Sequence, residues 1–149
     1  METFPVSHLL KQKGYDVITI GPTATVFEAI RTMVDHNVGS ILVMEEDAIV
    51  GIFTERDYLR RIALEGRTSS TTKVHEVMTT EVRTVRPNRT IGECLSLMTK
   101  HKCRHLPVCT REGELQGIVS IGDCVKHIST QAKEEVETLK SYIAGGYPA

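Results

Sequence analysis

A hydroxyl residue followed three positions later by an aspartate occurs twice in this chain, each time after a glycine and two apolar residues. The first motif reads Gly51-Ile-Phe-Thr54-Glu-Arg-Asp57, and the second reads Gly117-Ile-Val-Ser120-Ile-Gly-Asp123. At a helix start this spacing forms a capping box, in which side chains satisfy the first backbone N–H groups. The same carboxylate can accept hydrogen bonds from the vicinal hydroxyls of a ribose, beside N–H groups that attract phosphate. The pattern predicts a structural cap or a ribose-phosphate site.

Basic residues near the two motifs are candidate phosphate ligands. Arg56 lies inside the first motif, and Arg104 and His105 precede the second. A guanidinium group pairs well with phosphate, although each of these side chains can equally be a solvated surface group. Gly122 stands where the first motif has Arg56, so the two motifs are not equivalent.

The motifs belong to a longer internal repeat. Positions that match under a shift of 65 residues include Val17 and Val82, Thr19 and Thr84, Thr25 and Thr90, Glu28 and Glu93, and Val43 and Val108. One residue inserted near Gly113 changes the shift to 66, which a hairpin loop tolerates. The chain therefore predicts two copies of one structural unit.

Each copy predicts the same order of elements. An extended segment (17–20 or 82–85) leads to a helix of some ten residues, which Thr25 or Thr90 caps with Glu28 or Glu93 completing the box. Two strands then form a hairpin, and a second helix begins at Thr54 or Ser120. The expected strands are 40–44 with 49–53, and 105–109 with 115–119. The unit is β-α-β-β-α, and the fold class is α/β.

The repeats set the expected domain organisation. Residues 6–65 are the first repeat, 66–73 a polar linker, 74–128 the second repeat, and 129–149 a C-terminal helix and tail. Segment 6–13 is expected to be a short helix ended by Gly14, and 74–78 an equivalent lead-in turn. A longer helical pattern runs from Val125 to Ile143, and Gly145-Gly146 is expected to stop it.

Composition and charge restrict the class of protein. Of the 149 residues, 40% are apolar and 25% charged, and the formal net charge is −1. These values are typical of a soluble globular protein, and they leave no basic footprint for nucleic acid or an anionic membrane. No apolar run approaches the ~20 residues that span a bilayer, and the N-terminus lacks a signal-peptide pattern. We expect a cytoplasmic protein.

The repeat resembles the CBS domain, named after cystathionine β-synthase, over nearly all of residues 6–128. The resemblance is carried by Thr54-Glu-Arg-Asp-Tyr58-Leu-Arg, Gly66-Arg, Arg104-His-Leu-Pro107-Val, Ser120-Ile-Gly-Asp123 and Leu139-Lys-Ser-Tyr142-Ile-Ala-Gly145. Two such repeats resemble a Bateman module, whose two three-stranded sheets pack about a pseudo-two-fold axis and leave two clefts. The small stand-alone CBS-pair proteins of bacteria and plants are the most similar type.

The resemblance implies an adenosine ligand: AMP, ADP or ATP, with NAD(H) as a further candidate and no metal. Carried over by position, Thr54 with Asp57 and Ser120 with Asp123 would hold ribose. Thr19 and Thr84 would face the base. Backbone groups around Gly39-Ser40-Ile41 and His105-Leu106-Pro107 would read the adenine edge. Apolar side chains would wall the ring: Ile41, Ile52, Leu106 and Ile118. The candidates for phosphate contact are Arg56, Arg60, Arg104 and His105.

The resemblance also implies a regulatory role. Ligand binding between the repeats would shift their mutual angle, and a partner would read the change in trans; in the plant relatives that partner is a thioredoxin. Apolar faces near Tyr58, Leu59 and Ile62, and near Val125 and Ile128, are expected to form a homodimer. No nucleophile, base and orienting group cluster at recognisable spacing, so we expect no enzyme. The isolated His8, His75 and His127 are interpreted as surface residues.

Two other interpretations stay open. The chain can be a dimerisation scaffold without bound nucleotide, or a metal or nucleic-acid binder. His101, Cys103 and His105 would lie on one face of a strand and offer three metal ligands. The helix residues Arg56, Arg60 and Arg61 form a small basic cluster, although the bulk charge speaks against nucleic acid. The four cysteines, without a C-x-x-C pair, are expected to be free thiols.

Overall fold

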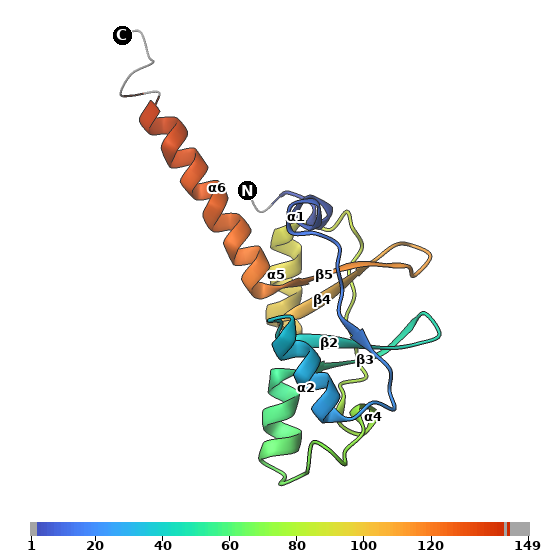
Figure 1. The fold of residues 1–149 in the computed structure, drawn as a ribbon. Coiled ribbons are helices and arrows are strands. Elements are labelled where there is room, and N and C mark those ends of the chain that lie inside the picture. Colours follow the sequence, from blue (N-terminus) through green and yellow to red (C-terminus); the bar gives the residue numbers. More distant parts are fainter. Residues whose placement is uncertain (1–2, 142, 144–149) are drawn as a thin grey trace. The chain divides into compact units, whose positions relative to one another are not determined.

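The structure is a computed structural model that describes residues 3–141 and 143, and its elements divide into two compact units (Figure 1). Residues 16–83 form the first-repeat unit. The segment up to Tyr15, together with residues from Thr84 onward, forms the second-repeat unit. Each unit contains a small sheet and helices, so the predicted α/β class is confirmed.

The first-repeat unit is built on a three-stranded sheet in the order β1-β2-β3. Its elements are β1 (Thr19–Ile20), α2 (Val26–Asp35), β2 (Ser40–Glu45), β3 (Ala48–Thr54), α3 (Glu55–Asp57), the π-helical η1 (Tyr58–Ala63) and α4 (Val74–Val77). β1 pairs parallel with β2, and β2 pairs antiparallel with β3. Phe53, Ile41 and Ile62 lie in its core. Ile62 is therefore not available for the predicted dimer surface, whereas Leu59 is exposed.

The second-repeat unit contains a two-stranded sheet. Its elements are α1 (Val6–Lys13), α5 (Ile91–His101), β4 (His105–Cys109), β5 (Leu115–Ser120) and α6 (Ile121–Ser141). The extended segment expected at 82–85 forms one bridge, between Val85 and Val108, instead of a strand. In the first-repeat unit the backbone N–H of Leu42 donates to Ile18 at 3.1 Å. Pro107 occupies the equivalent position and has no N–H to donate, which removes that ladder bond.

Helix starts follow the predicted capping pattern with one difference. Thr90 and Glu93 form a complete capping box at α5, with bonds of 3.1 Å in both directions. At α2, Thr25 accepts a hydrogen bond from the Glu28 N–H at 3.1 Å, but the Glu28 carboxylate does not return one. The box predicted at Thr25 is thus half formed.

The two helices that open the sequence repeats, α1 and α4, are called the lead-in helices here, and each packs in the unit of the other repeat. α1 opens the first repeat in sequence but packs in the second-repeat unit, where the Val6 N–H donates to the Arg89 carbonyl at 2.6 Å. α4 opens the second repeat in sequence but packs in the first-repeat unit, where the Val74 N–H donates to the Ala24 carbonyl at 2.8 Å. The compact units therefore have different boundaries from the sequence repeats.

Glycines in the hairpins make room for the exchanged helices. A Cβ atom at Gly117 would approach the Leu10 side chain to 2.8 Å, and one at Gly51 would overlap Met78. Both distances are closer than real Cβ contacts allow, so a side chain at either position requires the Leu10 or Met78 side chain to shift. The glycine of each motif thus serves helix packing as well as the strand.

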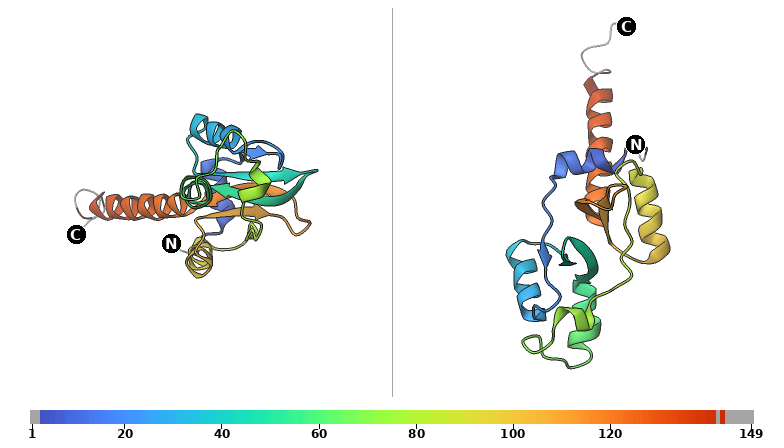
Figure 2. Two further views of the ribbon diagram at one scale, coloured as in Figure 1. Left: turned by 90° about the horizontal axis from the view of Figure 1, so that it is seen from below. Right: turned by 90° about the vertical axis from the view of Figure 1, so that its right-hand side faces the viewer.

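α6 is one continuous helix from Ile121 to Ser141, and residue 128, the expected end of the second repeat, lies inside it. Figures 1 and 2 show its C-terminal half extending beyond the other elements of the second-repeat unit. The expected stop at Gly145-Gly146 lies outside the described residues. Among the helices of the described residues, none is long and apolar enough to cross a membrane.

Candidate functional site

The first motif places a buried carboxylate at the start of α3. Asp57 is 7% exposed. Its Oδ2 accepts hydrogen bonds from the Thr54 backbone N–H at 3.0 Å and the Thr54 hydroxyl at 3.1 Å. The Asp57 N–H donates to Thr54 Oγ1 at 3.2 Å, which completes a capping box. Its other oxygen, Oδ1, accepts a hydrogen bond from the Thr79 hydroxyl at 3.0 Å.

The second motif repeats this geometry at the start of α6 with a different outer partner. Asp123 Oδ2 accepts from the Ser120 N–H at 2.9 Å, and the Asp123 N–H donates to Ser120 Oγ at 3.1 Å. The Lys13 ammonium donates to the same Oδ2 at 2.5 Å and to the Ile118 carbonyl at 2.6 Å. We call Thr54, Asp57 and Thr79 the first half-site, and Ser120, Asp123 and Lys13 the second half-site.

The cap and the ligand interpretation are compatible in both units. The capping bonds use Oδ2 of each aspartate, and within the described part of the chain no residue donates to Oδ1 of Asp123. A carboxylate has about four lone-pair positions, so each aspartate keeps acceptor capacity after capping. The capping bonds therefore leave lone pairs on both carboxylates, more of them on Asp123 than on Asp57, whose Oδ1 already accepts from Thr79.

Thr79 and Lys13 were missed by sequence reasoning. Lys13 ends α1 and Thr79 follows α4, and each reaches the motif of the other sequence repeat, Thr79 over 22 positions and Lys13 over 110. Neither side chain belongs to a local pattern with its aspartate. The one available signal was the match between the lead-ins, which begin at Val6 and Val74.

Several expected ligand residues lie beside these caps. Ser40 pairs with Thr54 across β2 and β3, and His105 pairs with Ser120 across β4 and β5. The carbonyl of Gly39 accepts from the Glu55 N–H at 3.1 Å, and the carbonyl of Arg104 accepts from the Ile121 N–H at 2.9 Å. The structure thus brings Gly39 and Ser40 to the first half-site, and Arg104 and His105 to the second.

Other predicted residues are placed differently. The side chains of Ile41 and Leu106, which were expected to wall the base, lie instead in the hydrophobic cores of their own units, where both residues pair within the hairpins. Pro107 is buried, and its carbonyl accepts from the Val85 N–H at 3.0 Å. Thr19 is exposed on β1, and Thr84 is exposed outside any strand.

The basic side chains expected to contact phosphate differ in solvent exposure and in charge. Arg56 and Arg104 are exposed. Burial, with the nearby Lys13 and Arg104 charges, lowers the pKa of His105 against the opposing effect of Asp123. His105 is therefore expected to face a phosphate as a neutral imidazole at pH 7. Burial would raise the pKa of Asp123, but hydrogen bonds from Lys13 and Ser120 outweigh it and hold that pKa below its usual value.

The proposed row of metal ligands is not formed. His101 is the last residue of α5 and Lys102 adopts a left-handed conformation, so His101, Cys103 and His105 do not alternate along one strand. Within residues 3–141 and 143, no group of three His, Cys, Asp or Glu side chains could hold a metal ion. Burial raises the pKa of Cys94 to about 12 and that of Cys124 to about 11, so both thiols stay protonated.

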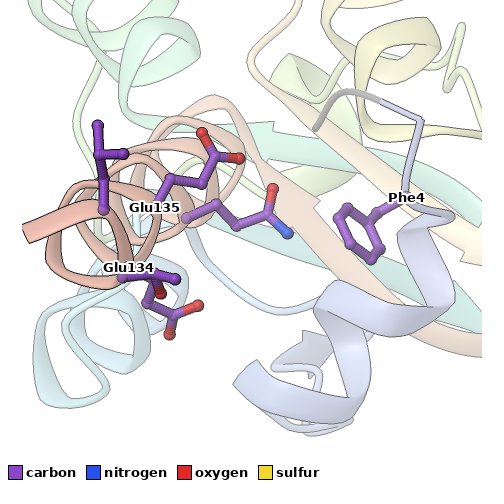
Figure 3. Close-up of a pocket in the computed structure, with 6 residues that line it drawn as sticks. Phe4, Glu134 and Glu135 are labelled. Carbon is purple, nitrogen blue, oxygen red and sulfur yellow. The ribbon is translucent and has the colours of Figure 1, made fainter. Parts of the chain in front are cut away.

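An open cavity of about 500 Å³ lies between Phe4 and the second half of α6, lined by Phe4, Gln131, Glu134, Glu135, Thr138 and Leu139 (Figure 3). None of the expected ligand residues lines it. Close by, His127 is buried rather than on the surface as predicted: it contacts Gln12 at 3.2 Å and lies edge-on to the Phe4 and His8 rings. This cluster ties α1 to α6.

Buried histidines predict acid sensitivity of the second-repeat unit. Burial lowers the pKa of both His105 and His127 in the fold. The unfolded chain therefore binds more protons, so stability is fully present above pH ~6.5 and falls as the pH drops below it, by up to about 1.4 kcal/mol per pH unit for each histidine. Thermal unfolding between pH 7.5 and 5.5 measures this. His127→Gln should reduce the pH dependence, and exchanging the exposed His75 for glutamine should not. Equal stability at both pH values would contradict the prediction.

Comparison with known proteins identifies the same two repeats that the sequence predicts. The CBS domain family model matches residues 7–64 and again residues 74–130. The CBS domain-containing protein CBSX3, mitochondrial, of Arabidopsis thaliana is 39% identical over 155 residues, covering 98% of this chain and 75% of CBSX3.

Solved structures of CBS-domain proteins share the fold. The CBS domain structure NE2398 has a TM-score of 0.80 at 42% identity, covering 84% of this chain and 97% of its own. A putative signal-transduction protein with CBS domains from Burkholderia ambifaria has a TM-score of 0.79 at 38% identity and covers 98% of both chains.

Two more distant structures share the fold and carry ligands. The CBS pair of MJ0100 is in complex with 5′-methylthioadenosine and S-adenosylmethionine (22% identity over 87% of this chain and 98% of its own, TM-score 0.76). PAE2072 of Pyrobaculum aerophilum is complexed with AMP (24% identity over 80% of this chain and 89% of its own, TM-score 0.72). With its two matched repeats and its relatives at 39% identity and above, this chain belongs to the CBS-domain family and carries a pair of CBS domains.

Proposed function

We propose that this chain is a regulatory module that binds an adenosine nucleotide and acts on a partner protein in trans, without catalysis of its own. The observation that carries the proposal is the pair of matching half-sites. In each unit a hydroxyl and a carboxylate are fixed at a helix start, with acceptor capacity left on the carboxylate.

The chemistry of the half-sites suits a nucleoside. The vicinal hydroxyls of a ribose donate to Asp57 or Asp123, and a hydrogen bond to a charged acceptor contributes about 1.5–3 kcal/mol. Gly39, Ser40 and Ile41, and the segment from His105 to Pro107, offer backbone groups to the base, with Thr19 and Thr84 near its other edge. Arg56 and Arg104, both exposed, are free to move toward a phosphate.

The ligands of related folds support adenosine in particular. Adenine and ribose are common to AMP, 5′-methylthioadenosine and S-adenosylmethionine, the ligands named for PAE2072 and MJ0100. We expect AMP, ADP or ATP here, with NAD(H) as the next candidate. A thioredoxin-like effector and a cytoplasmic location stay predictions; CBSX3 itself is described as mitochondrial.

The test is thermal unfolding of the full chain against AMP, ADP, ATP, NAD, NADH and S-adenosylmethionine. A ligand present at ~100 times its Kd adds about 2.7 kcal/mol, which raises Tm by roughly 5–10 °C at this size. GMP and CMP at the same concentration serve as controls. A selective rise with adenosine compounds supports the proposal, and no rise with any of them at millimolar concentration contradicts it.

A second candidate function, dimerisation without nucleotide, is favoured by one face of α6. Apolar residues follow intervals of four, three, four, four, three and four: Ile121, Val125, Ile128, Ala132, Val136, Leu139 and, just beyond the helix, Ile143. Most of this stripe is exposed, with Leu139 at 58% and Ile143 at 73%. The intervals read the same in both directions from Ala132. An antiparallel second copy would therefore place Val125 against Leu139 and Ile128 against Val136.

Sedimentation equilibrium separates this candidate from the first. A dimer that Leu139→Glu converts to a monomer, while the neighbouring Lys133→Glu does not, supports self-association through the α6 stripe. Combined with no response to nucleotides, that result assigns the chain to the scaffold class. A monomer at all concentrations rules the scaffold out.

A further inference from the structure

The two half-sites differ in the charge that the exchanged lead-in brings to the aspartate. In the first half-site a neutral hydroxyl, that of Thr79, contacts Asp57 at 3.0 Å. In the second an ammonium group, that of Lys13, contacts Asp123 at 2.5 Å. The aspartates themselves sit in the same type of cap, so the lead-in residue is the main chemical difference between their immediate contacts.

Packing fixes the position of Lys13. It is the last residue of α1, and Gly14 ends the helix with φ 108°. Leu10, one turn earlier, is 1% exposed and fills the space left by Gly117. The side chain of Lys13 is only 30% exposed, and the Ile118 carbonyl holds its ammonium from a second side at 2.6 Å. The cation is therefore positioned before any ligand arrives.

The contacts leave room for a ligand at both partners. An ammonium group has three N–H donors, and two of those of Lys13 are engaged by Asp123 and Ile118. Both described donors to Asp123 use Oδ2, which leaves Oδ1 for a ribose hydroxyl. A nucleoside can thus bind Asp123 while Lys13 stays in place and offers its third N–H.

The other basic groups near Asp123 do not supply a fixed charge. His105 has a lowered pKa, for which burial and the Lys13 charge are responsible, so it is neutral at pH 7. Arg104 is exposed and its charge is screened by water. Lys13 alone, among the described residues bonded to Asp123, neutralises the carboxylate that would otherwise repel a phosphate.

We propose that Lys13 is a specificity-determining residue of the second half-site, which makes that site select adenosine ligands with an anionic phosphate over uncharged adenosine and over the sulfonium of S-adenosylmethionine. This rests on the proposed function, since it concerns the same site. A charge within about 8–10 Å of a phosphate, the Debye length at physiological salt, is incompletely screened. In the first half-site the uncharged Thr79 contacts the carboxylate, and among the described residues no cation is bonded to Asp57; Arg61, held by the carbonyls of Val77 and Met78, is bonded to the backbone instead.

The experiment is calorimetric titration of the full chain with AMP, adenosine and S-adenosylmethionine. Asp57→Ala and Asp123→Ala assign each binding event to a half-site. At the Asp123-dependent site, Lys13→Thr should lower the preference for AMP over adenosine on the order of tenfold. Lys13→Arg, which keeps the charge, should retain most of the preference.

A control variant separates the local charge from other effects. Lys11→Thr removes a positive charge from an exposed position of the same helix, and should leave the preference unchanged. Thermal unfolding without ligand shows whether each variant folds; if Lys13→Thr does not, Lys13→Met provides the same charge removal.

The outcomes are distinct from those of the proposed function. If no adenosine compound binds the parent chain, the proposed function fails before Lys13 is tested. If nucleotides bind but Lys13→Thr keeps or increases the preference for AMP, the role of Lys13 is overturned. If Asp123→Ala changes no binding event, Lys13 governs no site and the inference is equally wrong.

Discussion

Replacing Leu10 with alanine is expected to lower the free energy of unfolding of the second-repeat unit by about 2–5 kcal/mol. Leu10 is 1% exposed and belongs to the hydrophobic core that also contains Leu106, Val108 and Val119. Truncation removes buried methyl groups and leaves a cavity, because the neighbouring strands cannot fully collapse into the space. The affected unit is the second-repeat unit, although Leu10 belongs to the first repeat in sequence.

Hydrogen exchange measures where the loss falls. Amides of residues 84–124 should exchange faster in Leu10→Ala, while those of residues 16–83 keep most of their protection. The matched control is Leu64→Ala, the same substitution at a residue that is 82% exposed. It should change the free energy of unfolding by less than about 0.5 kcal/mol. Faster hydrogen exchange confined to residues 16–83 would show that α1 packs against the first repeat and not in the second-repeat unit.

Exchanging Asp57 or Asp123 for asparagine is expected to weaken nucleotide binding about 10- to 100-fold at the half-site concerned. Asparagine has nearly the same shape and keeps one acceptor oxygen, so the helix cap at Thr54 or Ser120 can persist. The lost charge weakens the bonds accepted from the ribose hydroxyls, and each such bond contributes about 1.5–3 kcal/mol. Binding should therefore fall far more than stability.

Calorimetry with the nucleotide that gives the largest thermal shift checks this result. Glu55→Gln is the control, since it removes an exposed carboxylate two residues from Asp57 on the same helix. Its affinity should match that of the parent chain. Equal affinity in both aspartate variants would mean that the motifs are helix caps and nothing more.

The sequence by itself determined the features that depend on near neighbours. A cap needs a hydroxyl and a carboxylate three positions apart, so Thr54 with Asp57 and Ser120 with Asp123 are readable from the chain. Hairpins and amphipathic helices follow from short-range periodicity in the same way. Repetition of these local patterns predicted the α/β fold of two repeats, and the matched family model confirms the family.

Other features were open to local reasoning but were not recognised. Pro107 removes a ladder N–H beside the segment at 82–85, which reduces an expected strand to a bridge at Val85. The left-handed Lys102 separates His101 from the strand that begins at His105. In both cases periodicity alone suggested a regular element, and backbone chemistry interrupted it.

Only the tertiary structure decided which lead-in helix serves which repeat. The sequences beginning at Val6 and Val74 are alike, and each fits an apolar surface beside a hairpin glycine. Local propensity therefore cannot choose between neighbouring and exchanged packing. That choice depends on how well Leu10 fills the space at Gly117 and Met78 the space at Gly51. The exchanged packing also places Lys13 against the carboxylate of Asp123, 110 positions away. This contact creates the difference in charge between the two half-sites.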